Sequence, residues 1–433
     1  MGEVSRGARA VVVCPDIRGV SYDLDAEARL EEACGLALAI GIIVVQATII
    51  PVRDVKPNTL FGAGQVDNIQ AACALEEAEL VIVDGALSPI QQRNLEEKLK
   101  LKVIDRTGLI LEIFGERAAT AEGRLQVELA HLDYQQSRLV RSWTHLERQR
   151  GGFGFLGGPG ETQIEADRRM IRQRMARLRK ELEQVRKTRA LHRERRGRAP
   201  WPIIALVGYT NAGKSTLFNK MTGADVMAED LLFATLDPTM RAVRLPGVEK
   251  AILSDTVGFI SDLPTQLVAA FRATLEEVTA ADVIVHVRDI SNPSAAAQKS
   301  QVLAVLADLG VIDSEDGIST IPIVEAWNKW DLLDSESREE LAEIAAGDDM
   351  ILPISAVTGE GIDTLVTELD TLLTQGAREH HFLLPASAGQ KIAWLHAHGQ
   401  VLSEEEAGSD AEGPLRALHV RLTPKEFGRF ESI

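Results

Sequence analysis

Short apolar runs alternate with amphipathic stretches over the first part of the chain. The runs cover residues 10–13, 42–45, 80–83 and 103–104, and residues 24–38 are an example of the amphipathic stretches between them. Runs this short are typical of buried strands, whereas apolar positions three or four residues apart are typical of helices. Residues 8 to about 115 are therefore predicted to form an α/β domain.

The pattern then becomes helical. Helical periodicity runs from residue 118 to 150, stops at the glycine-rich segment 151–160, and resumes over residues 161–196 without a proline. Long helices joined by such a loop predict an antiparallel hairpin. Residues 197–200 contain glycine and proline and are expected to be a linker.

A second alternation of strands and helices follows the linker. Strands are expected at residues 203–207, 240–245, 251–254, 283–287, 321–327 and 351–354. This order predicts a doubly wound, mostly parallel sheet. The last segment, from about residue 381, has a helical stretch at 389–399, an acidic stretch at 403–413 expected to be a flexible loop, and a strand at 418–422. We expect four units: an α/β domain (1–117), a basic hairpin with a glycine-rich tip (118–198), a phosphate-loop domain (199–378) and a small α+β module (379–433).

The composition predicts that the chain does not span a membrane. Of the 433 residues, 45% are hydrophobic, as in ordinary globular proteins, and the longest apolar stretch, residues 36–45, is too short for a bilayer. The N-terminus lacks a signal-peptide core, and Arg6 breaks the myristoylation pattern. We expect a cytosolic monomer. Cys14, Cys34 and Cys73 lack metal-ligand spacing, so reduced thiols without a chemical role are predicted.

The charge is unevenly distributed. A net charge of −17 argues against nucleic acid as a general partner, yet residues 168–198 are densely basic. The arginines there are spaced too closely for one helical face, so a helix basic nearly all round is expected. The closely spaced arginines are Arg168, Arg169, Arg172, Arg174, Arg177 and Arg179. Each could pair with a nearby carboxylate, but the hairpin as a whole favours RNA contact. In the tip, Phe153 and Phe155 could stack on bases or pack the tip onto itself.

A phosphate-binding loop follows the expected strand at 203–207. It consists of Gly208, Tyr209, Thr210, Asn211, Ala212, Gly213, Lys214 and Ser215, and Thr216 opens a helix behind it. The glycines let backbone N–H groups face phosphates, Lys214 reaches the β and γ oxygens, and Ser215 holds Mg²⁺. The helix presents its positive end to the same anion. A nucleoside triphosphate is the expected ligand.

Two segments farther along indicate guanine. Asn328, Lys329, Trp330 and Asp331 directly follow an expected strand, and a carboxylate there can accept from guanine N1–H and the exocyclic amine. Adenine would leave that carboxylate facing an acceptor, which is costly in a desolvated site. Ser355, Ala356 and Val357 follow the last expected strand and fit a backbone loop over the guanine oxygen.

Two further segments are expected to meet the metal and the γ-phosphate. Asp255, Thr256, Val257 and Gly258 end a strand, so that Asp255 can hold Mg²⁺ through water and the Gly258 N–H can approach the γ-phosphate. The polar stretch with Phe233, Ala234, Thr235, Leu236 and Asp237 offers Thr235 as a second direct Mg²⁺ ligand. Lys214, Thr235 and Gly258 are the expected catalytic groups.

These five segments in this order resemble the translation-factor class of GTPases. In many regulatory GTPases a glutamine follows the Asp-x-x-Gly segment and orients the attacking water, but Phe259 stands there in this chain. A phenyl ring cannot position water. The resemblance therefore implies slow intrinsic GTP hydrolysis that another loop, a cation or a partner completes, and no catalytic base can be named.

Segments outside the phosphate-loop domain resemble the HflX family of ribosome-associated GTPases. They include residues 122–129, 144–152, 157–169 and 233–239, with Gly-Pro-Gly-Glu-x-Gln at 158–163 the most specific. The similarity covers roughly residues 55–376, and it departs at Gly62-Ala63-Gly64-Gln65, where lysines are expected after the glycines. That departure argues against phosphate or RNA binding by this loop.

The resemblance implies binding to the large ribosomal subunit, with the 144–198 hairpin directed toward the peptidyl-transferase region, and splitting of stalled or idle ribosomes. Two alternatives stay open: a GTPase acting in subunit assembly or RNA modification, and a non-enzymatic RNA-binding scaffold. The sequence assigns no role to residues 379–433 and leaves open whether the N-terminal domain binds a second nucleotide.

Overall fold

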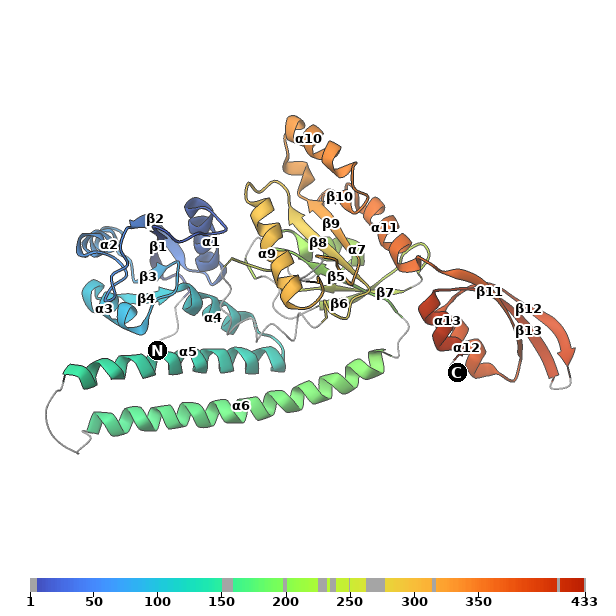
Figure 1. Ribbon diagram of the computed structural model, residues 1–433, viewed down its shortest axis with the longest axis horizontal. Helices are drawn as coiled ribbons and strands as arrows, with labels where there is room; N and C mark the ends of the chain where they lie inside the picture. The colour runs from blue at the N-terminus through green and yellow to red at the C-terminus, as the bar shows by residue number, and fades with distance from the viewer. Residues whose placement is uncertain are drawn as a thin grey trace.

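A computed structural model describes the chain except residues 1–5, 150–158, 198–200, 225–231, 234–238, 249, 262–276, 314–316, 411–412 and 432–433. The described residues form a four-stranded, a six-stranded and a three-stranded sheet, and a long helical hairpin connects the first two (Figure 1). The expected fold class, α/β with a phosphate-loop domain and a small C-terminal module, is confirmed.

The N-terminal domain is a parallel sheet in the order β2-β1-β3-β4, covered by helices. Its elements are β1 (Arg9–Ile17), α1 (Ala26–Ala39), β2 (Ile43–Val52), α2 (Ala63–Leu75), β3 (Leu80–Val83), α3 (Pro89–Leu99), β4 (Lys102–Asp105) and α4 (Arg106–Arg117). The helix starts are capped locally: Asp25 and Asp105 accept backbone N–H groups of α1 and α4. At α2, Gln65 accepts from Gly62 N–H and donates to Pro51 O, so it closes the turn where the family resemblance expects a lysine.

The hairpin consists of α5 (Ala121–Gln149) and α6 (Pro159–Gly197), which run side by side (Figure 1). Met175, Leu178 and Leu182 of α6 are buried at helical spacing. The expectation that α6 is basic nearly all round is therefore wrong along this apolar seam, which packs the hairpin together. The outer positions remain basic: Arg169, Arg172, Arg174, Arg177 and Arg179 are exposed. The glycine-rich tip, with Phe153 and Phe155, lies outside the described residues.

The six-stranded sheet follows in the order β10-β9-β8-β5-β7-β6, parallel except for β6. Its strands are β5 (Ile203–Val207), β6 (Thr239–Val243), β7 (Ala251–Asp255), β8 (Val283–Asp289), β9 (Ile323–Asn328) and β10 (Ile351–Pro353). The helical segments are α7 (Lys214–Thr222), α9 (Ala295–Asp308), η1 (Trp330–Leu332), α10 (Ser335–Ala345) and α11 (Ile362–Thr374). All six expected strands are present, displaced at their ends by two residues or fewer.

The C-terminal module contains an antiparallel sheet in the order β11-β13-β12 with two helices. Its elements are β11 (Arg378–Pro385), α12 (Gly389–His398), β12 (Gln400–Asp410), β13 (Gly413–Leu422) and α13 (Pro424–Glu431). The expectation of an acidic flexible loop at 403–413 is wrong, because β12 pairs with β13 through most of it. Glu404 lies beside Arg416 and His396, so the acidic composition reflects an exposed strand face.

No helix in the described part of the chain has the length and apolar character that crossing a membrane requires.

Candidate nucleotide site

The phosphate loop lies at the carboxyl end of β5, between β7 and β8. Leu206 is opposite Asp255 of β7, and Val207 is opposite His286 of β8. Gly208 has φ +151° and a Cβ there would lie 2.1 Å from the Val287 carbonyl oxygen. At Gly213, with φ +91°, a Cβ would lie 2.1 Å from Asn328 Nδ2. Both positions require glycine because atoms of Val287 and Asn328 occupy the space that a side chain would take. This requirement adds to the need for the backbone to approach a phosphate closely.

Lys214 is buried at the first turn of α7. Its Nζ donates to the carbonyl oxygens of Gly208 at 3.0 Å and Tyr209 at 2.7 Å. Burial lowers the pKa of Lys214 to about 8, and the neighbouring Asp255 opposes part of that shift. The ammonium is thus held over the phosphate loop but is poorly solvated, so a bound anion would stabilise its charged form.

This pKa predicts a pH dependence of nucleotide affinity. Above pH 8 the free protein carries neutral Lys214, and binding of a phosphate anion must then take up a proton. The affinity for GDP should be nearly constant from pH 6.5 to 7.5 and fall roughly five- to tenfold between pH 7.5 and 9. Fluorescent GDP titrated at each pH measures it. An unchanged affinity through pH 9 would show that Lys214 does not titrate in this range.

The oxygens expected to serve a metal lie together. Ser215 Oγ donates to Asp255 Oδ2 at 2.7 Å, and Asp255 is fully buried at the end of β7. Thr256 Oγ1 donates to Leu206 O at 2.6 Å, which fixes the chain after Asp255 against β5. A hydroxyl and a carboxylate are the hard oxygen donors that Mg²⁺ prefers, so these residues fit the expected ion.

Asn328 connects the phosphate loop to the segment expected over the base. Its Nδ2 donates to Ala212 O at 2.7 Å, and its Oδ1 accepts from Ala356 N–H at 2.9 Å. Lys329, with φ +62°, pairs with Asp289 at 2.8 Å. Asp331 follows on η1, which buried Trp330 anchors to the domain. The structure therefore brings the expected base-binding segment beside the phosphate loop.

The segment after β10 lies at the same edge of the sheet. Ser355 Oγ accepts from Thr358 N–H at 3.1 Å, and Ser355 N–H donates to Glu360 O at 2.9 Å, which closes a tight turn. Ser355 and Ala356 are buried, whereas Val357 is exposed.

The chain that follows β7 pairs with the phosphate loop through an isolated bridge between Phe259 and Tyr209. Thr210 N–H donates to Phe259 O at 2.7 Å, and Phe259 N–H donates to Gly208 O at 3.1 Å. The Phe259 side chain is buried in a core cluster that also includes Phe233 and residues of the N-terminal domain. Phe259 thus acts as an apolar anchor for this segment. Ala234, Thr235, Leu236 and Asp237 lie outside the described residues, so the second expected metal ligand has no position here.

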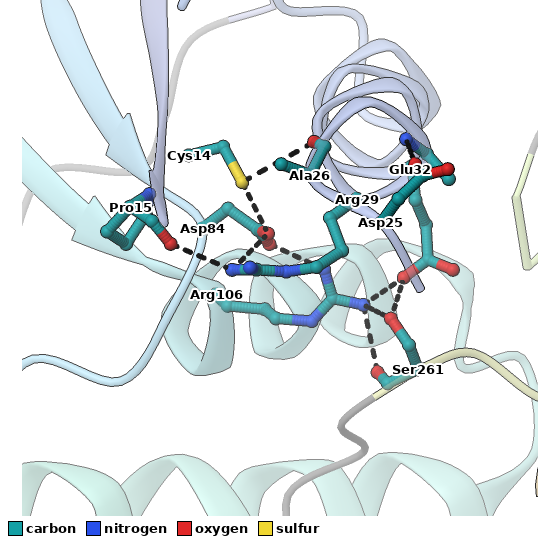
Figure 2. A network of polar contacts seen from close by, with 10 residues as sticks. Cys14, Pro15, Asp25, Ala26, Arg29, Glu32, Asp84, Arg106 and Ser261 are labelled. Atoms are coloured by element: carbon teal, nitrogen blue, oxygen red, sulfur yellow. Dashed lines mark hydrogen bonds and ion pairs between the residues drawn. The ribbon is translucent and has the colours of Figure 1, made fainter. Parts of the chain in front are cut away.

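Sequence reasoning missed a polar network that joins the N-terminal domain to this site (Figure 2). Arg106 donates to both Ser261 Oγ and Ser261 O at 2.9 Å and pairs with Asp84 and Glu32. Ser261 Oγ donates to Glu32 at 2.6 Å, and the hydroxyl of Tyr209 in the phosphate loop also donates to Glu32. Burial and the Glu32 carboxylate raise the pKa of Tyr209.

A sequence signal for part of this network existed. Asp84 and Arg106 follow β3 and β4 directly, and charged residues at the carboxyl ends of parallel strands mark the point where doubly wound sheets bind ligands. In this chain Ser261, from the segment after β7, lies at the carboxyl ends of these strands. Glu32, in the middle of amphipathic α1, carried no comparable signal.

Comparison with known proteins agrees with this architecture. Family models match in chain order: "GTP-binding GTPase N-terminal" at 27–115, "GTP-binding GTPase Middle Region" at 117–196, "50S ribosome-binding GTPase" at 203–329 and "HflX C-terminal domain" at 340–431. A solved structure titled as SsGBP in complex with GDP is 24% identical with a TM-score of 0.50, covers 85% of this chain and 99% of that chain, and supports the fold.

Two curated relatives extend the similarity over nearly the whole chain. The GTPase HflX of Magnetococcus marinus is 50% identical over 93% of this chain and 90% of that protein. The GTPase HflX of Escherichia coli is 44% identical over 91% of this chain and 89% of that protein. The chain belongs to the HflX family of GTPases and is a GTP-hydrolysing enzyme.

Proposed function

We propose that the protein binds the large ribosomal subunit and promotes dissociation of ribosomes or rescue of stalled ones, with the bound nucleotide controlling the interaction. The observation that carries this proposal is the hairpin α5–α6, because α6 carries exposed arginines and leads into the GTPase domain. A match to a family model described as a ribosome-binding GTPase supports it.

We also propose how the nucleotide is held. The backbone N–H groups from Asn211 to Thr216 and the Lys214 ammonium bind the phosphates, and Asp331 accepts from the guanine edge. Ser215 and Thr235 would ligate Mg²⁺, and Asp255 would hold it through water. When bound, Mg²⁺ neutralises charge on the β and γ oxygens. The Gly258 N–H would face the γ-phosphate.

The charge on α6 favours RNA as the surface that it meets. Arg174 pairs with Glu128 of α5 at 2.7 Å, across the two helices of the hairpin. Among the described residues, Arg169, Arg172, Arg177 and Arg179 have no ion-pair partner, although each is exposed. Exposed guanidinium groups along a helix suit the phosphates of an RNA groove.

Sedimentation tests the proposal. Purified protein with GTP should comigrate with large subunits and shift 70S particles toward free subunits in a sucrose gradient, whereas GDP should do neither. A protein that leaves 70S particles intact but prefers precursor particles over mature ones would instead support a role in subunit assembly. The non-enzymatic scaffold is not retained, because the chain is a GTP-hydrolysing enzyme.

A charge variant of the hairpin gives a sharper prediction. Replacing Arg172 and Arg179 with Gln should weaken binding to large subunits and lower the slope of log affinity against log salt by about one per lost phosphate contact. The matched control replaces Arg93 and Lys98 on the exposed face of α3, with the same change in charge. Equal effects of the two pairs would show that the hairpin is not the RNA-binding element.

A further inference from the structure

The hydroxyl of Thr210 is an unusual group in the phosphate loop. Thr210 is 7% exposed, and its Oγ1 has no hydrogen-bond partner in the part of the chain that the structure describes. Its neighbours Tyr209 and Lys214 do have partners: Tyr209 donates to Glu32, and Lys214 donates to backbone carbonyls. A buried unpaired hydroxyl costs about 1–3 kcal/mol, so such groups call for an explanation.

Thr210 lies where the phosphate loop meets the segment after β7. A Cβ placed on Gly258 would lie 2.8 Å from Thr210 Cγ2, 2.9 Å from Thr210 Cα and 3.0 Å from Lys214 Nζ. On the proposed assignment, the γ-phosphate binds between the Lys214 ammonium and the Gly258 N–H. The side chain of Thr210 is therefore beside the position where water must attack.

The backbone holds this side chain in place. Thr210 N–H is fixed to Phe259 O at 2.7 Å, and the Thr210 methyl is packed against Gly258. Threonine is β-branched and has few χ1 choices, so fixing its methyl also fixes its hydroxyl. Phe259, by contrast, has its ring buried in the interdomain core and offers no polar atom to water.

We propose that the Thr210 hydroxyl positions the attacking water, the task that a glutamine performs in many regulatory GTPases. A hydroxyl can accept and donate at once. In the GTP complex it accepts a hydrogen bond from the water and donates one to a γ-phosphate oxygen. The water oxygen forms a bond to the γ-phosphorus, the bond from that phosphorus to the β–γ bridging oxygen breaks with its electron pair leaving on GDP, and the water proton passes to the released phosphate. Thr210 is unchanged at the end.

Three variants test the proposal, which rests on the proposed nucleotide site. T210V keeps the shape and the methyl but removes the hydroxyl, T210S keeps the hydroxyl, and K214A tests the site itself. Single-turnover hydrolysis of GTP at saturating protein gives the chemical step, and fluorescent GDP gives the affinity. T210V should hydrolyse GTP about 10- to 100-fold more slowly with GDP affinity within about threefold of the parent protein, and T210S should recover most of the rate.

The outcomes separate the two proposals. T210V that hydrolyses GTP at the parental rate overturns the role of Thr210, and so does T210V that loses GDP affinity in parallel with rate, because the hydroxyl would then support the loop. If K214A binds GDP and GTP like the parent protein, the nucleotide site itself is misassigned, whatever Thr210 does. T210S as slow as T210V would also contradict a hydroxyl-based role.

Discussion

Asp331→Asn protein should lose about two to four orders of magnitude in GTP affinity and should gain binding of XTP. The carboxylate is expected to accept from both guanine N1–H and the exocyclic amine, and each hydrogen bond to a charged group contributes about 1.5–3 kcal/mol. An amide in its place presents a donor to the guanine edge. Xanthine has a carbonyl where guanine has the amine, so the same amide can donate to it. Competition of GTP and XTP against fluorescent GDP measures the change.

The matched control for this variant is Asp334→Asn, three residues away. Asp334 caps α10 by accepting from Ser337 N–H at 2.8 Å, and asparagine caps a helix about as well. The control should therefore keep the parental nucleotide preference. Asp331→Asn protein that still prefers GTP over XTP by the parental factor would contradict the assignment of this residue to the base.

The success of sequence reasoning at this site has a physical reason. Residues 208–215, 255–258 and 328–331 each lie at the carboxyl end of a buried apolar strand, and parallel strands in one sheet bring these ends to one edge. Local spacing therefore predicted which segments meet. It could not predict that Asn328 contacts both the phosphate loop and Ala356, because those contacts depend on the registers of β9 with β8 and with β10.

The failures arise where distant segments decide the structure. The acidic composition around Glu404 predicted a solvated loop. Hydrogen bonding to β13 instead makes these residues part of β12. No sequence pattern around Ser261 indicated its contact with Arg106. The two residues are 155 positions apart in the sequence. The apolar contact between the domains is equally non-local, as Phe114 of α4 meets Phe233 edge to face with ring centroids 4.9 Å apart.

Replacing Arg106 should cause the largest loss of stability in the N-terminal domain. The guanidinium is 6% exposed and is paired with the buried carboxylates of Asp84 and Glu32. Arg106→Met keeps the apolar stem but leaves those carboxylates with fewer partners, and breaking a buried pair in this way costs about 3–5 kcal/mol. Hydrogen exchange of the β1, β3 and β4 amides, which reports opening free energies, measures the loss.

Two comparisons isolate the electrostatic cause of that loss. Arg93→Met removes the exposed pair with Glu97, whose side chains are both 58% exposed, and should cost at most about 1 kcal/mol. In Arg106→Met the Glu32 carboxylate stays buried without its guanidinium partner, and Asp84 keeps only Arg29. Adding Glu32→Gln should restore part of the stability at pH 8, since it removes one buried charge. A loss in Arg106→Met no greater than in Arg93→Met would mean that the network does not stabilise the domain.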